Sequence, residues 1–481
     1  MTGEKNPVTI KRYIHFIVTA VIIFGARLLP PIAPITEEGM VILGAFIGAM
    51  YGWTFIDMLW PSILAMFSMG MELGVGNVVA AGLGNTVTWM LIFFYIIIGI
   101  LTECHIVDTI AAWFLTRKIT KGKPWFLYTI MVVGCFFCSM LNGFGSLIIF
   151  LALTFKMCEL MNIKPYSKFP TMMAIGIVLS VALAAIMFPF KGTSLTMLIA
   201  WQGITGLSVD YVKYMVVSFP IGLFILLIFV LISRFVIRVD VMPLKQFDPK
   251  KMGIQVEKLT MDQKLALVIV VWAILDLIIP SLLPKTISVV AWLDSLTVFG
   301  QVALPVLVFM VIQYKNRPVI EFSKIAAKYV PWELFMMMGV IMPLTSFLTA
   351  DTTGIKPFMT SLVQPLMGLG AALFIIILMA LTVFLTNFAN NAVVGMIMMP
   401  VIYAFSTAGG GLSPTAALMI LIFCCHFAFL TPGATPFAAI MFSNTKWVRS
   451  TNIFKYGIPT ILLLFGCTLP VCYFWSTFIL G

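Results

Sequence analysis

The chain has 481 residues, of which 61% are hydrophobic and 10% are charged. A soluble domain carries charge on about a quarter of its residues, whereas here apolar runs of about 20 residues, each long enough to cross a bilayer, recur along the whole chain. This composition excludes nucleotide-binding and soluble catalytic domains and predicts an integral membrane protein. The formal net charge of +11 lies on short loops between the apolar runs, so we expect no nucleic-acid partner.

The order of apolar and charged segments predicts an all-α polytopic membrane protein with about 11 transmembrane helices and two re-entrant helical hairpins. The expected spans are 13–30, 38–54, 57–71, 87–103, 168–189 continuing past a break, 213–235, 265–283, 293–313, 332–349, 415–443 with a break, and 456–478. The run after Arg12 shows no small-residue cleavage site, which indicates an uncleaved first span. The distribution of Lys and Arg predicts a multi-pass protein of the inner (cytoplasmic) membrane, with its N-terminus in the cytoplasm and its C-terminus outside.

Two further apolar stretches are predicted to enter the membrane and return on the same side. Stretch 124–155 is flanked by the basic segments 117–123 and 156–168. By the positive-inside rule both flanks are cytoplasmic, so the stretch is an inward-facing hairpin. Stretch 366–403 has flanks that are poor in Lys and Arg, which predicts a hairpin that enters from outside.

An internal repeat is visible in the sequence. The segments that start at Trp89 and Trp332 each carry a Leu-Thr pair twelve residues after the Trp, and each precedes a hairpin and an interrupted helix. The predicted parts are an N-terminal tail and first transmembrane helix (1–37), a first inverted repeat (38–235), a cytoplasmic linker (236–264) and a second inverted repeat (265–478). Inverted repeats with broken helices are typical of secondary transporters, which bind substrate where the repeats meet.

Flexible or polar residues occur at four places of predicted membrane depth. They are the hairpin tips 138–146 and 384–394 and the helix breaks 188–196 and 430–438. Taken singly, each is also explained as a kink in a packed span. Together, four half-helix N-termini would offer N–H groups and positive dipole ends to a carboxylate or another oxyanion. The candidate substrate-binding residues are Asn142, Gly143, Lys191, Thr193, Ser194, Asn390, Asn391, Thr435 and Pro436.

Lys191 is an unusual residue in this pattern, because a lysine at the bilayer centre costs about 2.5–3.5 kcal/mol. It adjoins the first helix break in an otherwise uncharged segment. Two interpretations remain open. Lys191 extends its ammonium group to the membrane interface from the end of a span, or it is a fixed cation that attracts the anion or takes the place of a bound sodium ion.

Three other observations concern chemistry outside these breaks. Asp276 is an acid within an apolar run, where it either relays protons or faces a polar crevice. His426 follows Cys424 and Cys425, and packing or backbone hydrogen bonding is a better explanation for it than metal binding. The sequence contains no HExxH or GxSxG motif, so we expect no enzyme and no catalytic residues.

At these residues the chain resembles the divalent anion:sodium symporter (DASS) family of the ion-transporter superfamily. The resemblance covers roughly 38–478 and is carried by "VPWELFMMMG" (330–339), "NNAVVGMIMMPV" (390–401) and "ATPFAAIMF" (434–442). It implies a homodimeric secondary active transporter of small organic anions (di- or tricarboxylates) that works by an elevator-type alternating-access mechanism. The alternatives within the superfamily are a transporter of another anion, such as sulfate or arsenite, and a cation/proton antiporter.

The resemblance also implies two sodium sites, which in this sequence would use Asn142, Gly192, Asn390 and Ala434. The Ser-Asn-Thr triplet of the family aligns here with 141–143 and 389–391, where only the Asn is kept at both tips. Both sodium sites therefore lack a hydroxyl ligand. Coupling stays open between sodium symport and anion exchange, and we expect no cofactor other than sodium ions.

Overall fold

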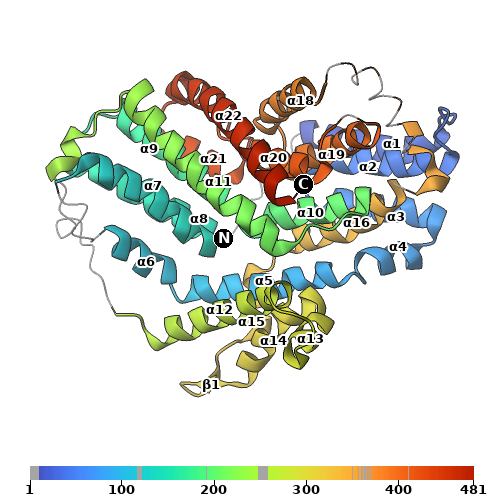
Figure 1. The fold of residues 1–481 in the computed structure, drawn as a ribbon, viewed down its shortest axis with the longest axis horizontal. Helices are drawn as coiled ribbons and strands as arrows, with labels where there is room; N and C mark the ends of the chain where they lie inside the picture. The colour runs from blue at the N-terminus through green and yellow to red at the C-terminus, as the bar shows by residue number, and fades with distance from the viewer. Residues whose placement is uncertain are drawn as a thin grey trace.

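The structure is a computed structural model that describes residues 10–115, 122–190, 192–246, 258–348, 350–355, 357–358, 361, 365, 368, 370–409 and 411–480. Within these residues the chain is built almost entirely of α-helices (Figure 1). The exception is a short antiparallel strand pair, β1 (Gln313–Tyr314) and β2 (Arg317–Pro318), in which Gln313 pairs with Pro318.

The helices follow one another with short connections. Before the first hairpin they are α1 (Ile10–Gly25), α2 (Glu37–Phe55), α3 (Leu59–Leu73), α4 (Val75–Gly82), α5 (Thr86–Glu103) and α6 (Ile106–Leu115). Then come α7 (Pro124–Leu141), α8 (Gly143–Leu160), α9 (Lys168–Ala184), α10 (Gly192–Thr205) and α11 (Tyr211–Leu231).

The second half of the chain repeats this mixture of long and interrupted helices. Its first elements are α12 (Met261–Leu282), α13 (Ser288–Ser295), α14 (Thr297–Val311), α15 (Phe322–Tyr329) and α16 (Trp332–Leu348). The last are α18 (Gly370–Thr386), α19 (Asn391–Thr407), α20 (Pro414–Cys425), α21 (Pro436–Ser443) and α22 (Ser450–Leu480). Short 3-10 or π segments are η1 (Ala26–Leu28), η3 (Ile232–Val236), η4 (Met242–Gln246) and η6 (Asp351–Thr353).

Local sequence explains where several of these helices begin. Proline stands at the start of α7, α20 and α21, where its missing N–H costs nothing and its fixed φ suits a helix. Helix α12 begins with a capping box: the Gln263 amide N–H donates to the Thr260 hydroxyl (3.3 Å), and the Gln263 side chain accepts from the Thr260 N–H (3.1 Å).

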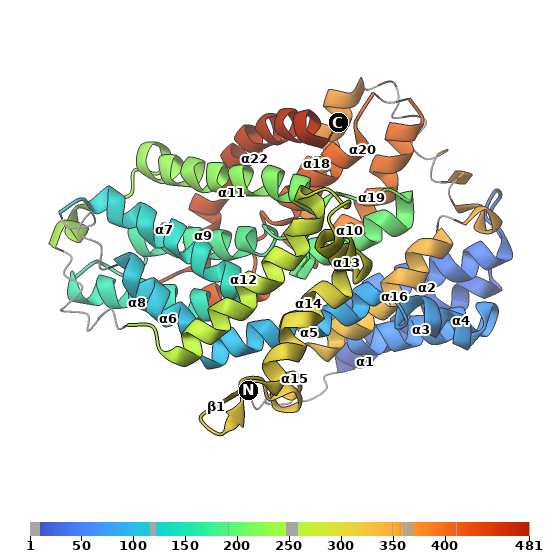
Figure 2. The same ribbon diagram turned by 60° about the horizontal axis from the view of Figure 1, so that its bottom comes forward.

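The helices pack as two groups. In the first helix group, α1–α5 pack with α12–α16, and in the second helix group, α6–α9 and α11 pack with one another and with α18–α22. Helix α10 lies between the groups, because it packs against α16 of the first and α19 of the second. The two views agree: α1–α4 and α16 lie at the end of the molecule opposite α7–α9 (Figures 1 and 2).

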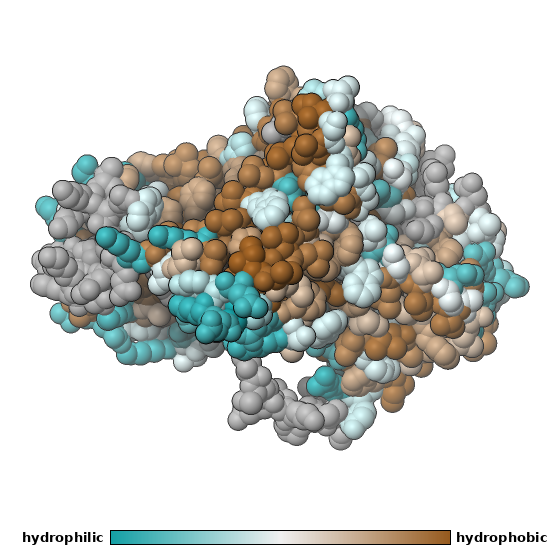
Figure 3. All heavy atoms as spheres, turned by 90° about the horizontal axis from the view of Figure 1, so that it is seen from below, coloured by the Kyte–Doolittle hydropathy of each residue, from teal (hydrophilic) through white to brown (hydrophobic). Residues whose placement is uncertain are grey.

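The membrane-protein class predicted from the sequence is confirmed. Among the described residues, six helices are long and apolar enough to cross a membrane, or up to eight if two sharply bent helix pairs are each one span. The pairs are α13 with α14, bent by 100°, and α15 with α16, bent by 79°. The number of 11 spans stays a prediction, because the broken helices are shorter than a full span. On the face on the side of α12–α15, apolar side chains cover the middle, with a hydrophilic patch beside them and further hydrophilic side chains toward both ends (Figure 3).

The helices differ in detail from the expected spans. The expected hairpin 124–155 is α7 and α8, which extend to Leu160, and the expected hairpin 366–403 contains α18 and α19, which extend to Thr407. The expected span 293–313 is interrupted, since α13 meets α14 at Thr297, a residue with a positive φ of 55°. The apolar run there is long enough for one span, but its backbone turns.

Candidate functional site

The tip of the first hairpin is a single residue, Asn142, between α7 and α8. Its backbone is extended, and its side-chain Oδ1 accepts a hydrogen bond from the Gly145 N–H (3.0 Å), which caps the N-terminus of α8. Its Nδ2 donates to the Thr102 hydroxyl near the end of α5 (2.9 Å). At Gly143 a Cβ would lie 3.2 Å from Val181 of α9, so a small residue fits this turn best. The tip is thus held between α5 and α9.

The first helix break, between α9 and α10, is supported by side chains of α11. The hydroxyl of Tyr214 donates to the Ile186 carbonyl (2.8 Å), and the hydroxyl of Ser218 donates to the Met187 carbonyl (2.9 Å). These donors replace the intrahelical partners that the break removes. The break is therefore stabilised from the neighbouring helix.

At the start of α10, the sequence prediction placed four candidate residues. Gly192 has a φ of +57°, a conformation that favours glycine. Ser194 is buried, and its hydroxyl donates to the Phe188 carbonyl across the break. Thr193 is partly buried in the first turn of the helix. Lys191 lies outside the described residues.

The second hairpin turns over residues 387–390, between α18 and α19. The Oδ1 of Asn390 accepts from the Ala392 N–H (2.9 Å) and caps α19. Asn391 is buried, and its Oδ1 accepts from the Thr386 hydroxyl (2.7 Å). Both predicted tip residues therefore lie at the N-terminus of α19.

The second helix break, between α20 and α21, is capped by Thr435. Its hydroxyl oxygen accepts from the Ala438 N–H (3.0 Å) and lies 3.4 Å from the Ala428 carbonyl, to which it donates. Ala434 is buried next to it, whereas Pro436, the first residue of α21, is exposed. The half-helix α21 thus begins with a Thr-Pro pair of the kind that favours a helix start.

Asn387 joins the second hairpin to the second break, a role that the sequence analysis missed. Its Oδ1 accepts from the N–H groups of Phe429 (3.1 Å) and Leu430 (2.9 Å). Its Nδ2 donates to the carbonyls of Phe427 (2.9 Å) and Val383 (2.8 Å). These four bonds use the whole hydrogen-bonding capacity of the amide. Asn387 is therefore a clamp between two segments of backbone.

Two hydroxyl groups strengthen the same junction. The Thr386 hydroxyl oxygen also lies 2.7 Å from the Cys425 carbonyl, so its single proton is shared between this carbonyl and Asn391 Oδ1, and the Thr431 hydroxyl donates to the Asn387 carbonyl. The sequence signal for this junction is the density of polar residues in 386–391, of which only Asn390 and Asn391 were predicted to belong to the site.

The tips and breaks approach one another across the two halves of the chain. The Phe144 ring, next to the first tip, lies 4.9 Å from the Phe437 ring at the start of α21. Helix α10, which follows the first break, packs against α19, which follows the second tip. The half-helices therefore contact one another in two pairs across the halves of the chain, α8 with α21 and α10 with α19.

Two other candidates from the sequence have different surroundings. The Nδ1 of His426 lies 2.7 Å from the Ile422 carbonyl, and among the described residues no group of three or more His, Cys, Asp or Glu side chains could hold a metal ion. Asp276 is 4% exposed on α12, which packs mainly against α5 and α14 and lies apart from the four half-helices.

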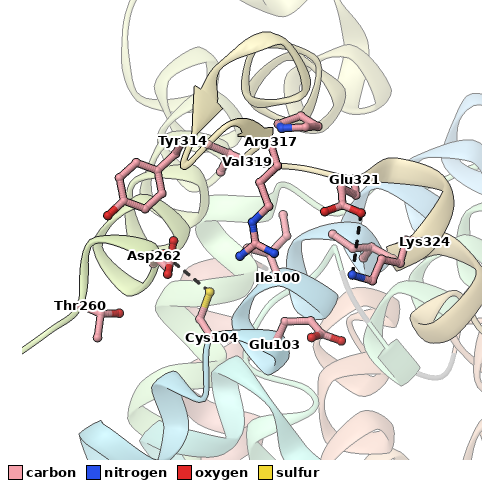
Figure 4. Close-up of a pocket in the computed structure, with 12 residues that line it drawn as sticks. Ile100, Glu103, Cys104, Thr260, Asp262, Tyr314, Arg317, Val319, Glu321 and Lys324 are labelled. Atoms are coloured by element: carbon pink, nitrogen blue, oxygen red, sulfur yellow. Dashed lines mark hydrogen bonds and ion pairs between the residues drawn. The ribbon is translucent and has the colours of Figure 1, made fainter.

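A cavity of about 270 Å³ lies elsewhere, at the end of α5 (Figure 4). It is bounded by the start of α12, the β1–β2 pair and α15, and none of the predicted site residues lines it. The lining residues are Ile100, Glu103, Cys104, Thr260, Asp262, Tyr314, Arg317, Pro318, Val319, Glu321, Lys324 and Ile325.

Comparison with known proteins yields three similarities. The family model CitMHS, described as citrate transporter, matches residues 8–311. The Na(+)/citrate cotransporter of Mus musculus is 24% identical over 214 residues, which are 40% of this chain and only 36% of that protein. The YdaH transporter of Alcanivorax borkumensis has a similar fold, with a TM-score of 0.57 at 12% identity, over 85% of this chain and 89% of that one.

Proposed function

This chain belongs to the citrate transporter family, and from this premise we propose that it is a secondary active transporter of small di- or tricarboxylate anions. Because the matched family is one of transporters, the prediction of a protein that is not an enzyme is confirmed. The choice of substrate is a proposal for this chain, because the match to the mouse cotransporter spans about a third of that protein.

The observation that carries the proposal is the set of four half-helix N-termini at the tips and breaks, which contact one another in two pairs, α8 with α21 and α10 with α19. Helices α8, α19 and α21 each begin with an Asn or Thr cap, and α10 begins with a Gly-Thr-Ser sequence. Helix N-termini attract negative charge because their first N–H groups lack intrahelical partners and their dipoles point the positive end outward. Several such ends suit a substrate that has several carboxylates.

We place the substrate between the first tip and second break on one side and the second tip and first break on the other. Asn142, Thr193, Ser194, Asn390, Asn391 and Thr435 would supply side-chain donors, and Gly143 and Pro436 would shape the backbone around them. We also include Lys191 among the substrate-binding residues, because it directly precedes Gly192 at the first break in the sequence.

For the mechanism we propose an elevator movement in which the second helix group and α10 slide against the first helix group. The division of the packing contacts into two groups supports this proposal. The boundaries 38–235 and 265–478 of the two inverted repeats, the inward and outward directions of the hairpins, and a homodimer held by the first helix group are parts of the same proposal.

We propose counter-anion exchange as the coupling mode. A sodium ion at either break would need free carbonyl oxygens near Asn142 and Gly192 or near Asn390 and Ala434. Donors from the protein already occupy the carbonyls of Ile186 and Met187 at the first break, and those of Cys425 and Phe427 near the second. Each occupied carbonyl has less capacity left for a cation, which favours exchange over sodium symport.

The test is uptake of labelled citrate and labelled succinate into proteoliposomes that contain the purified protein. One set of vesicles has an inward sodium gradient, and a second set is loaded with unlabelled dicarboxylate without sodium. Exchange predicts uptake only in the loaded vesicles. Uptake that needs sodium would overturn the exchange proposal and support sodium symport, and uptake of neither anion in either set would overturn the carboxylate proposal.

A further inference from the structure

Most of the charged side chains that line the cavity at the end of α5 form ion pairs, and one arginine does not. Each of the three carboxylates that line it is paired with a lysine. The pairs are Glu103 with Lys328 (2.5 Å), Asp262 with Lys315 (3.1 Å) and Glu321 with Lys324 (3.8 Å). The hydrogen bond to Asp262 and the charge of that carboxylate raise the pKa of Lys315, so this lysine stays protonated at neutral pH.

Arg317 is the exception. Its guanidinium group points into the space between Asp262 and Glu321, above Cys104 and Glu103 (Figure 4). Within the part of the chain that the structure describes, Arg317 forms no ion pair with a carboxylate. A guanidinium is charged at every physiological pH and offers a planar fork of donors that matches a carboxylate or phosphate.

A tight turn presents Arg317 to the cavity. Lys315 and Asn316 between the two strands have positive φ values of 53° and 59°, as a two-residue hairpin turn requires. The strand pair is continued by a hydrogen bond from the Val319 N–H to the Ile312 carbonyl (2.9 Å). The arginine therefore projects from a short, hydrogen-bonded hairpin.

The opposite wall is also fixed. The Gln263 side chain of α12 donates to the Cys104 carbonyl (3.0 Å) and to the Thr109 hydroxyl (3.0 Å). The Tyr329 hydroxyl donates to Glu103 (2.8 Å), which holds that carboxylate on its lysine. The carboxylates are thus held by their own partners, which leaves the arginine for a ligand.

We propose that this cavity is a second anion-binding site, separate from the helix breaks, which takes a carboxylate or phosphate group on Arg317. The volume of about 270 Å³ is at the small end for ligand pockets, so the ligand is a small anion or the headgroup of an anionic lipid. Binding does not depend on the proposed transport function, because no residue of the helix breaks lines the cavity.

The test is isothermal titration calorimetry of the full-length protein in lipid-free detergent, with inorganic phosphate and then citrate as probes. We expect Arg317→Gln to weaken binding of phosphate at least about tenfold, because charge-assisted hydrogen bonds are lost. Arg234→Gln is the matched control. It removes the same charge from an exposed arginine that lies over the Trp125 ring and does not line the cavity, and we expect unchanged binding.

The source of the anion is distinguished by repeating the comparison in nanodiscs that contain phosphatidylglycerol, with native mass spectrometry to count bound lipid. Phosphate binding in detergent that depends on Arg317 supports a soluble anion, and lipid retention that depends on Arg317 supports a headgroup. If Arg317→Gln changes neither, or if Arg234→Gln has the same effect, the proposal is overturned.

Citrate could also bind at the helix breaks, so the titration is repeated in an Asn390→Ala background. We expect Arg317 to control one binding event in both backgrounds. Failure of uptake in proteoliposomes with this event intact would overturn the transport proposal alone. Loss of the Arg317 effect with uptake intact would overturn the second site alone.

Discussion

At the residue scale, the amides of the second hairpin differ in what they hold. Asn387 makes four hydrogen bonds to backbone groups of two segments, whereas the side chain of Asn390 accepts one from Ala392. A fully bonded amide has no capacity left for a ligand. The N–H₂ group of Asn390 has no hydrogen-bond partner among the residues that the structure describes, so it retains the capacity to donate to a ligand. We therefore propose that Asn387 holds the framework of the site and that Asn390 contacts the substrate.

This difference predicts the effects of two alanine substitutions. Asn387→Ala leaves several buried backbone groups without partners, and each such group costs about 1–3 kcal/mol. We expect a clearly lower thermal unfolding midpoint in detergent together with a loss of uptake. Asn390→Ala removes one cap, worth about 1 kcal/mol, so we expect a midpoint close to that of the wild type and a loss of uptake. Equal midpoints for the two variants would contradict the assignment.

The same residues show how far the sequence predicts the site. Asn and Gly at tips and Thr-Pro at a break have local conformational reasons to interrupt a helix, so the interruptions at Asn142 and Thr435 are predictable. The partner of a side chain is not local. Nothing within six residues of Asn387 indicates that it contacts 427–430, since that contact depends on how α18 packs against α20.

At the element scale, α4 and α16 approach closely because glycine stands on both. A Cβ at Gly82 would lie 1.7 Å from the Gly339 carbonyl oxygen. Gly82→Ala therefore has to separate the helices, and overpacking of this kind costs about 1–3 kcal/mol or more. Gly76→Ala on the same helix is the control, because a Cβ there meets nothing within 4 Å. We expect a lower thermal midpoint only for Gly82→Ala, and the prediction is wrong if the two variants unfold alike.

The first hairpin is tied to α5 by the bond from Asn142 to Thr102, which joins the second helix group to the first. If the groups slide during transport, this bond has to break. Thr102→Val removes the acceptor and keeps the shape, and a net loss of about 0.5–1.5 kcal/mol shifts the conformational equilibrium about two- to tenfold. We expect the exchange rate to change within that range while the unfolding midpoint changes little.

The control for Thr102→Val is Thr129→Val, since the Thr129 hydroxyl donates only within α7, to the Trp125 carbonyl (2.9 Å). Identical exchange rates for the wild type and Thr102→Val would show that the bond has no part in the movement. The Leu-Thr pair of the sequence repeat marks Thr102, but its contact with the tip required the fold.

At the scale of the whole molecule, the helical membrane architecture was predictable, because composition and the interruption of apolar runs determine it. The transporter family was predicted from the resemblance of segments 330–339, 390–401 and 434–442. The cavity with Arg317 was not. Its walls come from α5, α12, α15 and the β1–β2 pair, which are far apart in the sequence. From the sequence alone, the charged residues between α14 and α15 indicate a solvent-exposed loop, and only the packing of these elements shows that they line a cavity.

The packing also bears on orientation in the membrane. Two basic segments that are far apart in the sequence lie together: Lys446 pairs with Glu159 (2.5 Å), and the Asn452 side chain donates to the Tyr166 carbonyl (2.7 Å). Segments 156–168 and 444–452 therefore share one membrane face, which the positive-inside rule assigns to the cytoplasm.

From this face the chain continues through α22, which has 31 residues and is long enough to cross the bilayer once. We therefore expect an epitope tag at the C-terminus to be cut by protease added to intact spheroplasts, and a tag at the N-terminus to be cut only after lysis. Insertion of a tag after Lys446 serves as the cytoplasmic control. Protection of the C-terminal tag in intact spheroplasts would contradict the orientation, and with it the assignment of inward and outward directions to the two hairpins.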